Sequence, residues 1–311
     1  MPTKPNEEFV VRMIDNPQVD AELKNYSSII DEIINYGSLV FGWAFANVHE
    51  GDQHVAMFAL YRRSLELLDT LSILIRNACI TPCKLLLRAL FETVLFVEYI
   101  TKENFEQRAR DFILCVKHKE LTVLKEHCPS DPLYSRYLTN LKNDSVFKNM
   151  PIVEIPEIEA AIKAKEILTN SNSYSASQEA YKATMERRKP YSPIWWFNLH
   201  DGPKSIFELA KAMQRPAQYK ILYEDWAGYA HGTGSFDGQV EISSVGIAIP
   251  QIRLPKDAEF ITFMAVSYGL TALRIMILMY AKERNVEFFE WYKREISSQY
   301  HDLKNRKIII K

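Results

Sequence analysis

Glycine, proline and cysteine are all scarce in this sequence. Its 311 residues include 10 Gly, 14 Pro and 4 Cys. So few glycines and prolines exclude collagen-like and low-complexity chains. Four cysteines do not make a disulfide framework in a chain of this length, and none of them forms the two-residue-gap pair of a zinc knuckle. We therefore expect free, buried thiols in a reducing cytoplasm, at Cys79, Cys83, Cys115 and Cys128.

An excess of charge of either sign is also missing. The 38 Lys and Arg residues balance 39 Asp and Glu, which gives a formal net charge of −1. Non-specific binding to nucleic acid depends on cationic side chains that contact the phosphates. With this charge balance, only a local basic patch would support nucleic-acid binding. The basic runs at 187–189 and 304–311 are expected to be solvated surface.

Only one long apolar run is present, at 260–281, and Arg274 is its only charged residue. The length matches a membrane span. However, Arg274 would then lie in hydrocarbon, at a cost of several kcal/mol. A buried helix inside a bundle is the preferred interpretation, without integral membrane insertion. The first fifteen residues lack the apolar core of a secretory signal, so a cytoplasmic location is expected.

Helical periodicity dominates the rest of the chain and predicts an all-α multi-helix bundle. We expect one helical domain over 1–311, with an N-terminal helix and link (1–54), core helices (55–128), an irregular helical arm (129–190) and a final part with a Trp/Tyr/His segment and C-terminal helices (191–311). Alternating apolar residues predict a small β-hairpin or extended excursion near 240–252. The individual helices are expected at 20–47, 55–76, 82–100, 104–127, 133–147, 157–188 in two pieces, 204–213, 215–230, 257–284 and 286–303.

Two helix ends carry recognisable capping signals. Thr81 precedes Pro82, which predicts Thr81 as the N-cap and Pro82 as the first helical residue. Gly232 follows His231 and predicts a C-terminal cap for the helix at 215–230.

The first candidate for chemistry is the pair Arg88 and Glu92. Their four-residue spacing places them on one face of an otherwise apolar helix. One interpretation is a structural ion pair between neighbouring helices. The other makes Arg88 an anion or phosphate clamp and Glu92 a base or an orienting carboxylate.

The second candidate is His231, at the end of a Tyr-rich helix. The helix dipole favours its protonated form there, which suits a general acid or base. A capping histidine beside flexible glycines is the equally weighted alternative. Aromatic residues upstream of His231 share a helical face. Core packing is the more common role of such a face, and stacking on nucleic-acid bases is the functional alternative. They are Tyr219, Tyr223 and Trp226, with Trp195 and Trp196 earlier in the chain.

We take Arg88, Glu92 and His231 as catalytic candidates, and Arg62, Trp195, Tyr223 and Tyr229 as substrate-binding candidates. Arg62 belongs to a charged stripe with Glu66 and Asp69 on one helical surface. The segment 49–54 contains two His and two acidic residues, but it lacks the helical two-His spacing of zinc motifs. No metal and no cofactor are expected, and nucleotide-binding and kinase signatures are missing.

Three segments together resemble a bacterial family of unknown function, the one numbered 5677. They are Leu60–Arg63, Leu86–Glu92, and the series Trp195, Tyr219, Tyr223 and Tyr229–Gly232. The resemblance covers roughly 52–280 and implies a helical fold in which Arg88, Glu92 and His231 converge. A looser analogy links the chain to HEPN-type helical ribonucleases of toxin and phage-defence systems, which use Arg and His without a metal. Their Arg and His lie in one short motif, whereas Arg88 and His231 are far apart in sequence.

Two function hypotheses follow. The first is a cytoplasmic defence- or toxin-type effector that cleaves RNA phosphodiesters without a metal, using Arg88, Glu92 and His231. The second is a non-catalytic interaction or sensor module, in which Arg88 and Glu92 form a structural ion pair and 151–190 contacts a protein partner or a second copy. RNA is the partner in the first case and protein in the second.

Overall fold

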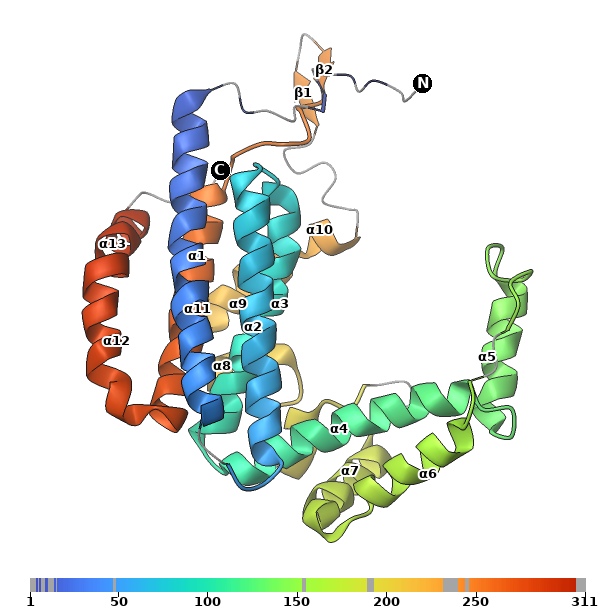
Figure 1. Cartoon of the computed structure of the whole chain (residues 1–311). Coiled ribbons are helices and arrows are strands. Elements are labelled where there is room, and N and C mark those ends of the chain that lie inside the picture. Colours follow the sequence, from blue (N-terminus) through green and yellow to red (C-terminus); the bar gives the residue numbers. More distant parts are fainter. Residues whose placement is uncertain are drawn as a thin grey trace. The chain divides into compact units, whose positions relative to one another are not determined.

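The computed structural model describes residues 4, 6, 9–10, 14, 16–46, 49–152, 155–188, 193–231, 240–243 and 246–305. Helices make up most of this described part, and the fold class is all-α, as the periodicity predicts (Figure 1). The α-helices are α1 (Pro17–Ala46), α2 (Gln53–Arg76), α3 (Ile80–Lys102), α4 (Phe105–Glu126), α5 (Pro132–Asn143), α6 (Ile158–Thr169), α7 (Ser175–Arg187), α8 (Ile206–Ala212), α9 (Pro216–Tyr219), α10 (Ala227–His231), α11 (Ala258–Tyr280), α12 (Asn285–Trp291) and α13 (Ser297–Asn305).

Shorter elements join these helices. The 3-10 turns are η1 (Asn172–Tyr174), η2 (Trp196–Asp201) and η5 (Lys282–Arg284), and the π-helical turns are η3 (Lys220–Asp225) and η6 (Tyr292–Ile296). Strand β1 (Glu241–Ser243) pairs antiparallel with β2 (Gly246–Ala248), with Ile242 opposite Ile247. This hairpin confirms the small β excursion expected near 240–252.

Contacts along the chain define two compact units. Unit 1 comprises 1–50, 57–103 and 209–311, and unit 2 comprises 51–56 and 104–208. The irregular helical arm expected at 129–190 therefore belongs to unit 2. The expectation of one domain over 1–311 stays a prediction.

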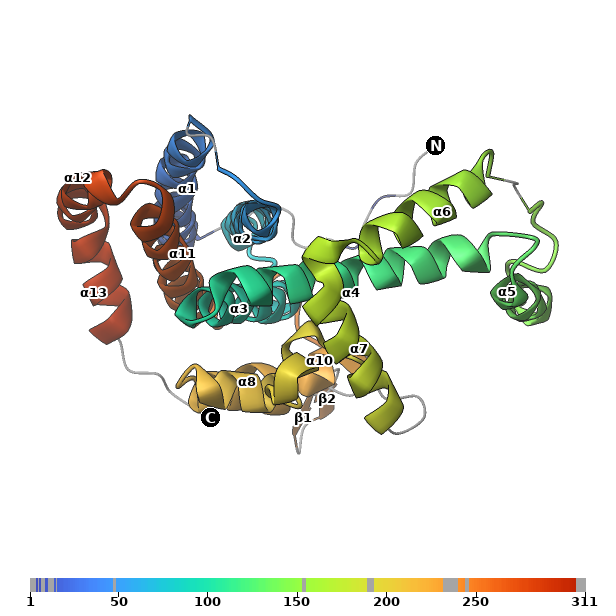
Figure 2. The same cartoon turned by 90° about the horizontal axis from the view of Figure 1, so that it is seen from below.

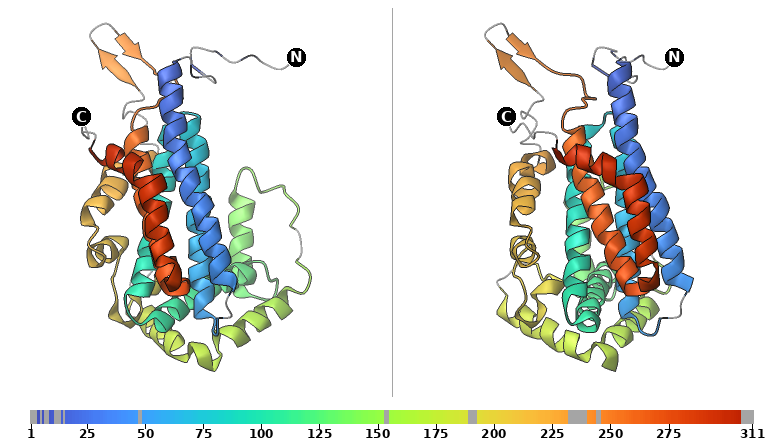
Figure 3. Two further views of the ribbon diagram at one scale, coloured as in Figure 1. Left: turned by 60° about the vertical axis from the view of Figure 1, so that its left-hand side comes forward. Right: turned by 90° about the vertical axis from the view of Figure 1, so that its left-hand side faces the viewer.

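The core of unit 1 is built from α1, α2, α3 and α11, which run side by side (Figure 1). The buried residues of α1 show why it packs there: Leu23, Ile30, Ile33 and Val40 recur at spacings of seven, three and seven, which is one helical face. Helix α11 contacts α1, α3 and α13. Figure 3 shows α12 and α13 alongside α11 and α1.

Two glycines allow the close packing of these helices. A Cβ at Gly37 of α1 would lie 2.7 Å from Leu65 Cδ2, and one at Gly269 of α11 would lie 2.8 Å from Ile33 Cγ2. The buried Tyr61 hydroxyl of α2 donates to the Gly37 carbonyl at 3.0 Å. A Cβ at either position would force the neighbouring side chain to shift.

Among the described helices, α11 alone is long and apolar enough to span a membrane by those two criteria. Its most apolar window is 61% buried within the protein. Buried residues occur around most of the helix, from Ile261 through Tyr268 to Ile277. The packing matches the expected buried bundle helix, and the absence of membrane insertion stays a prediction.

Unit 2 is organised around α4, against which α5, α6, α7 and η2 pack (Figure 2). The start of α5 follows the rules of helix capping. The Asp131 side chain accepts a hydrogen bond from the Leu133 backbone N–H at 2.9 Å, and Pro132 occupies the first turn.

Two local expectations need correction, and two others fall wholly or partly outside the described residues. Helix α3 begins at Ile80, so Cys79 and not Thr81 stands at the N-cap, without a side-chain cap bond. The helix expected at 215–230 is divided into α9, η3 and α10, because the π-helical turn inserts an i→i+5 bond from Trp226 N–H to the Ile221 carbonyl at 3.1 Å. The expected cap Gly232 lies outside the described residues, as does 306–311 of the C-terminal basic run. All four cysteines are free, three of them buried and Cys79 half-buried.

Candidate functional site on helix α3

A row of polar side chains follows α3, a helix whose other faces are apolar. Lys84, Arg88, Glu92 and Glu98 lie along this row, while Leu87, Phe91 and Val94 are buried. Charged groups on a helix in such apolar surroundings need partners. The partners come from the segment 215–229 and from Asp257, all in unit 1.

Arg88 and Glu92 form the predicted pair, but a loose one. Arg88 Nε lies 3.8 Å from Glu92 Oε1, beyond hydrogen-bond length. Both side chains are 28% exposed, so each is largely desolvated and still reachable from solvent. Burial raises the pKa of Glu92 above its ordinary value, and the nearby positive charge of Arg88 opposes this shift.

Tyr223 provides the other contact of Arg88. The guanidinium carbon of Arg88 lies 3.6 Å from the centroid of the Tyr223 ring, a cation–π contact. Tyr223 in turn stacks on Tyr219, with ring centroids 4.8 Å apart and an interplanar angle of 12°. Stacking occupies a face of the guanidinium and leaves its N–H edges as the groups that recognise an oxyanion. The Tyr223 hydroxyl is buried and has no hydrogen-bond partner among the described residues.

A second ion pair that involves α3, between Arg215 and Glu98, makes much closer contacts than the pair of Arg88 with Glu92. Arg215 donates to both carboxylate oxygens of Glu98, at 2.8 and 2.6 Å, and also to Gln218 at 3.0 Å. Tyr268 donates to the same Gln218 oxygen at 3.0 Å. In this fork-shaped arrangement all three guanidinium nitrogens of Arg215 donate, in contrast to the loose contact of Arg88 with Glu92.

Lys84 anchors α10 to α3. Its ammonium group donates to the Tyr229 hydroxyl at 3.1 Å, pairs with Asp257 at 2.9 Å and lies 4.2 Å from the Tyr229 ring centroid. The side chain of Lys84 is only 8% exposed. Tyr229 is therefore held one helical turn from Arg88 along α3. His231, the last residue of α10, is exposed.

The remaining candidates lie elsewhere. Arg62 is on the exposed surface of α2, where its guanidinium lies 3.5 Å from Glu66. Trp195 belongs to unit 2, and its ring stacks on Phe197 with centroids 5.6 Å apart. Their substrate-binding roles, and the convergence of His231 with Arg88 and Glu92, stay predictions.

Residues 54–243 match DUF5677, described as a family of unknown function. The chain belongs to this family. The resemblance to this family is thus confirmed, and every candidate catalytic and binding residue lies within the matched range. The analogy to HEPN-type ribonucleases stays a prediction. No curated protein and no solved structure matches the chain.

Sequence reasoning missed one polar cluster in the part of unit 2 that the DUF5677 match includes. Asp111 of α4 is 3% exposed and accepts a hydrogen bond from Gln107 at 2.9 Å. His200 Nε2 lies 3.4 Å from the same Asp111 oxygen, and Gln107 also donates to Ser177 at 2.8 Å. His200 has a positive φ of 55°, which is uncommon for a residue other than glycine. One sequence feature could have indicated this cluster: Asp111 lies on the same face of α4 as the apolar residues Leu114 and Cys115.

Lys84 was also missed, because a single lysine in an apolar segment gives no sign of its distant partners Tyr229 and Asp257.

The segment 49–54 does not resemble a metal centre. His49 lies 2.8 Å from the Ala44 carbonyl through its Nε2 and packs edge-on against Tyr280. Among the described residues, no group of three His, Cys, Asp or Glu has the geometry to hold a metal ion.

Proposed function

We propose that this DUF5677 protein is a cytoplasmic bacterial effector of a defence or toxin type that cleaves RNA phosphodiester bonds without a metal ion. The observation that carries the proposal is the half-buried Arg88, stacked on Tyr223 and only loosely paired with Glu92. In this role Arg88 binds the phosphate oxygens through its N–H edges. Glu92 orients Arg88, and His231 is the general base.

The reaction divides these roles as follows. His231 accepts the proton of the 2′-hydroxyl, and the 2′-oxygen attacks phosphorus. Arg88 stabilises the negative charge that develops on the phosphoryl oxygens. The bond from phosphorus to the 5′-oxygen breaks, and the leaving oxygen takes a proton from water. The resulting hydroxide takes the proton held by His231, which regenerates the base. The products are a 2′,3′-cyclic phosphate and a 5′-hydroxyl end.

The local surroundings support an anion site at Arg88. Lys84 adds a second positive charge one turn away, although Asp257 pairs with it at 2.9 Å. The Tyr223 ring lies on the Arg88 guanidinium, and the buried hydroxyl of Tyr223 has no hydrogen-bond partner among the described residues.

Growth and phage survival in cells that express the protein test this function. The wild type is expected to slow growth or protect against phage, with shortened cellular RNA. Arg88→Ala and His231→Ala are expected to abolish both effects at equal levels of folded protein. Arg136→Ala, at an exposed position of α5 in unit 2, is the matched control and is expected to behave as the wild type. Folded Arg88→Ala and His231→Ala variants that keep the wild-type effect would refute the proposal.

A second candidate function is a non-catalytic interaction or sensor module, in which Arg88 and Glu92 only stabilise α3. One observation favours it: α5 has no buried residue, and the segment after it exposes several large apolar side chains. Such exposed groups are typical of protein contacts. They are Val146, Phe147, Met150, Ile152 and Ile155, with 43–65% of each residue exposed.

This alternative predicts self-association or capture of a protein partner through the region around 151–190. Light scattering coupled to size-exclusion chromatography measures the molecular mass of the wild type and of Ile152→Ser with Ile155→Ser, two exposed residues of this region. A mass above that of the 36.1 kDa chain, lost in the double variant, supports self-association. A monomeric wild type removes self-association from this candidate.

A further inference from the structure

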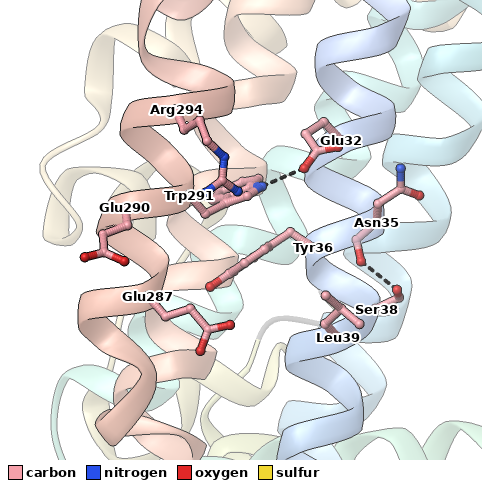
Figure 4. A pocket seen from close by; sticks show the side chains of 9 residues that line it. All are labelled: Glu32, Asn35, Tyr36, Ser38, Leu39, Glu287, Glu290, Trp291 and Arg294. Carbon is pink, nitrogen blue, oxygen red and sulfur yellow. Dashed lines mark hydrogen bonds between the residues drawn. The ribbon is translucent and has the colours of Figure 1, made fainter.

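A cavity of about 610 Å³ lies in unit 1 between α1 on one side and α12 with η6 on the other (Figure 4). This volume falls within the range of about 300–1,000 Å³ usual for small-molecule sites. Both walls lie outside the range matched to DUF5677. The cavity is lined by Glu32, Asn35, Tyr36, Ser38, Leu39, Glu287, Glu290, Trp291 and Arg294.

The lining is acidic. It carries three carboxylates, Glu32, Glu287 and Glu290, and the guanidinium of Arg294. Glu287 is paired with Arg284, outside the lining, at 2.9 Å. Arg294 already donates to Glu295, outside the lining, at 2.5 Å. Figure 4 shows the three carboxylates at separate points around the cavity. Glu32 and Glu290 belong to no ion pair among the described residues, so these two carboxylates favour a ligand with two positive charges.

One wall of the cavity is aromatic. The Tyr36 and Trp291 rings stack with centroids 4.1 Å apart and an interplanar angle of 16°. Trp291 Nε1 donates to Glu32 Oε1 at 2.6 Å, which fixes the indole. Aromatic rings next to carboxylates form the usual setting for organic cations.

Tyr36 adds an unsatisfied polar group. The residue is 6% exposed, and its hydroxyl has no hydrogen-bond partner among the described residues. In Figure 4 the ring reaches from α1 across the cavity, with its hydroxyl on the side of Glu287 and Glu290. Burial and the negative charge of Glu287 raise the pKa of Tyr36 to about 12, so the phenol is neutral and its oxygen accepts a hydrogen bond. A buried hydroxyl without a partner costs stability, which a donor in the cavity would restore.

We propose that this cavity binds an organic polyamine, an alkyl chain that carries two or more ammonium groups. One ammonium group donates to the Tyr36 hydroxyl and pairs with Glu290. Another pairs with Glu32, and the methylene chain lies along the Tyr36–Trp291 wall. The proposal is independent of RNA cleavage, because none of these residues belongs to the Arg88 site.

Calorimetric titration of the full chain with spermidine tests the proposal. Saturable binding to one site is expected. Glu32→Gln with Glu290→Gln is expected to weaken binding by about tenfold or more, since charge-assisted hydrogen bonds are lost. The matched control is Glu22→Gln with Glu283→Gln, which removes the same charge at exposed positions outside the lining. This control is expected to bind within about twofold of the wild type.

Tyr36→Phe separates binding from folding. It keeps the stacked ring and removes only the unpartnered hydroxyl, so thermal unfolding should stay at or above the wild-type temperature while binding weakens severalfold. Absence of spermidine binding would overturn the proposal. Equal weakening in the control pair, or equally tight binding of Mg²⁺ at the same ionic strength, would also overturn it, because either marks non-specific charge attraction.

Discussion

The Tyr223 ring covers the guanidinium of Arg88 at 3.6 Å, and the hydroxyl of the same tyrosine has no hydrogen-bond partner among the described residues. The ring and the hydroxyl therefore have separable effects. Tyr223→Phe is expected to change the free energy of unfolding by no more than about 0.5 kcal/mol, since no hydrogen bond is lost. Tyr223→Ala is expected to lower it by about 1–3 kcal/mol through lost packing and the lost cation–π contact. Urea denaturation measures both, and equal losses in the two variants would show that the hydroxyl is bonded.

Glu92 predicts a specific pH dependence of stability. Burial raises its pKa in the folded state above the ordinary value of 4.5. The folded state therefore holds this proton more tightly than the unfolded state. The stability that the protonated Glu92 contributes is present below pH 4.5 and is lost as pH rises through the raised pKa.

Glu92→Gln cannot titrate and serves as the reference for this effect. The free energy of unfolding of the wild type minus that of Glu92→Gln is expected to fall as pH rises above 4.5 and then to level off. Urea denaturation at closely spaced pH values gives this difference. A difference that stays constant or rises with pH would contradict the assigned direction of the shift.

Lys84 is expected to hold α10 against α3. Lys84→Ala removes the hydrogen-bond donor to Tyr229 and the positive charge that pairs with Asp257. The free energy of unfolding should fall by about 1–3 kcal/mol. This loss is smaller than for a fully buried ion pair, because Asp257 is partly exposed. Hydrogen exchange in 227–231 should accelerate. Lys24→Ala breaks only the exposed pair with Asp20 and should cost less than about 1 kcal/mol. Unchanged exchange in α10 would show that Lys84 does not anchor it.

Two glycines of α1 should respond in opposite ways to alanine. A Cβ at Gly37 would lie 2.7 Å from Leu65 Cδ2 and 3.1 Å from the Tyr61 hydroxyl, so Gly37→Ala should lower the free energy of unfolding by about 1–3 kcal/mol. Gly42 has no atom within 4 Å of such a Cβ, and Gly42→Ala should raise it by about 0.5–1 kcal/mol. Thermal denaturation compares them. Stabilisation by both would contradict the packing of α1 on α2.

The long helices of unit 1 follow from sequence because their apolar residues repeat at helical spacing. Leu23, Ile30 and Ile33 identify the buried face of α1 without knowledge of its partners. The π-helical turn η3 does not follow in this way, since one additional residue in a turn leaves no periodic signal. That turn belongs to the segment that stacks Tyr219 on Tyr223 and Tyr223 on Arg88.

The Arg88–Glu92 pair was predictable because four-residue spacing on one helix is local. The contacts of Lys84 with Tyr229 and Asp257 join residues more than 140 positions apart, and no local pattern encodes them. The cavity between α1 and α12 escaped notice for the same reason. Tyr36 and Trp291 look like ordinary core aromatics until their stacking and the three carboxylates around them are seen together.

The most direct test of the proposed activity is cleavage of a labelled RNA oligonucleotide by the purified chain in the presence of EDTA, beside the same oligonucleotide made entirely with 2′-deoxy sugars. The account predicts that only the RNA is cleaved, with 2′,3′-cyclic phosphate ends. It also predicts that Arg88→Ala and His231→Ala lower the rate by about 100-fold or more, whereas Arg136→Ala does not. Intact RNA after incubation with the folded wild type, or equal cleavage by the Arg88→Ala variant, would contradict the account.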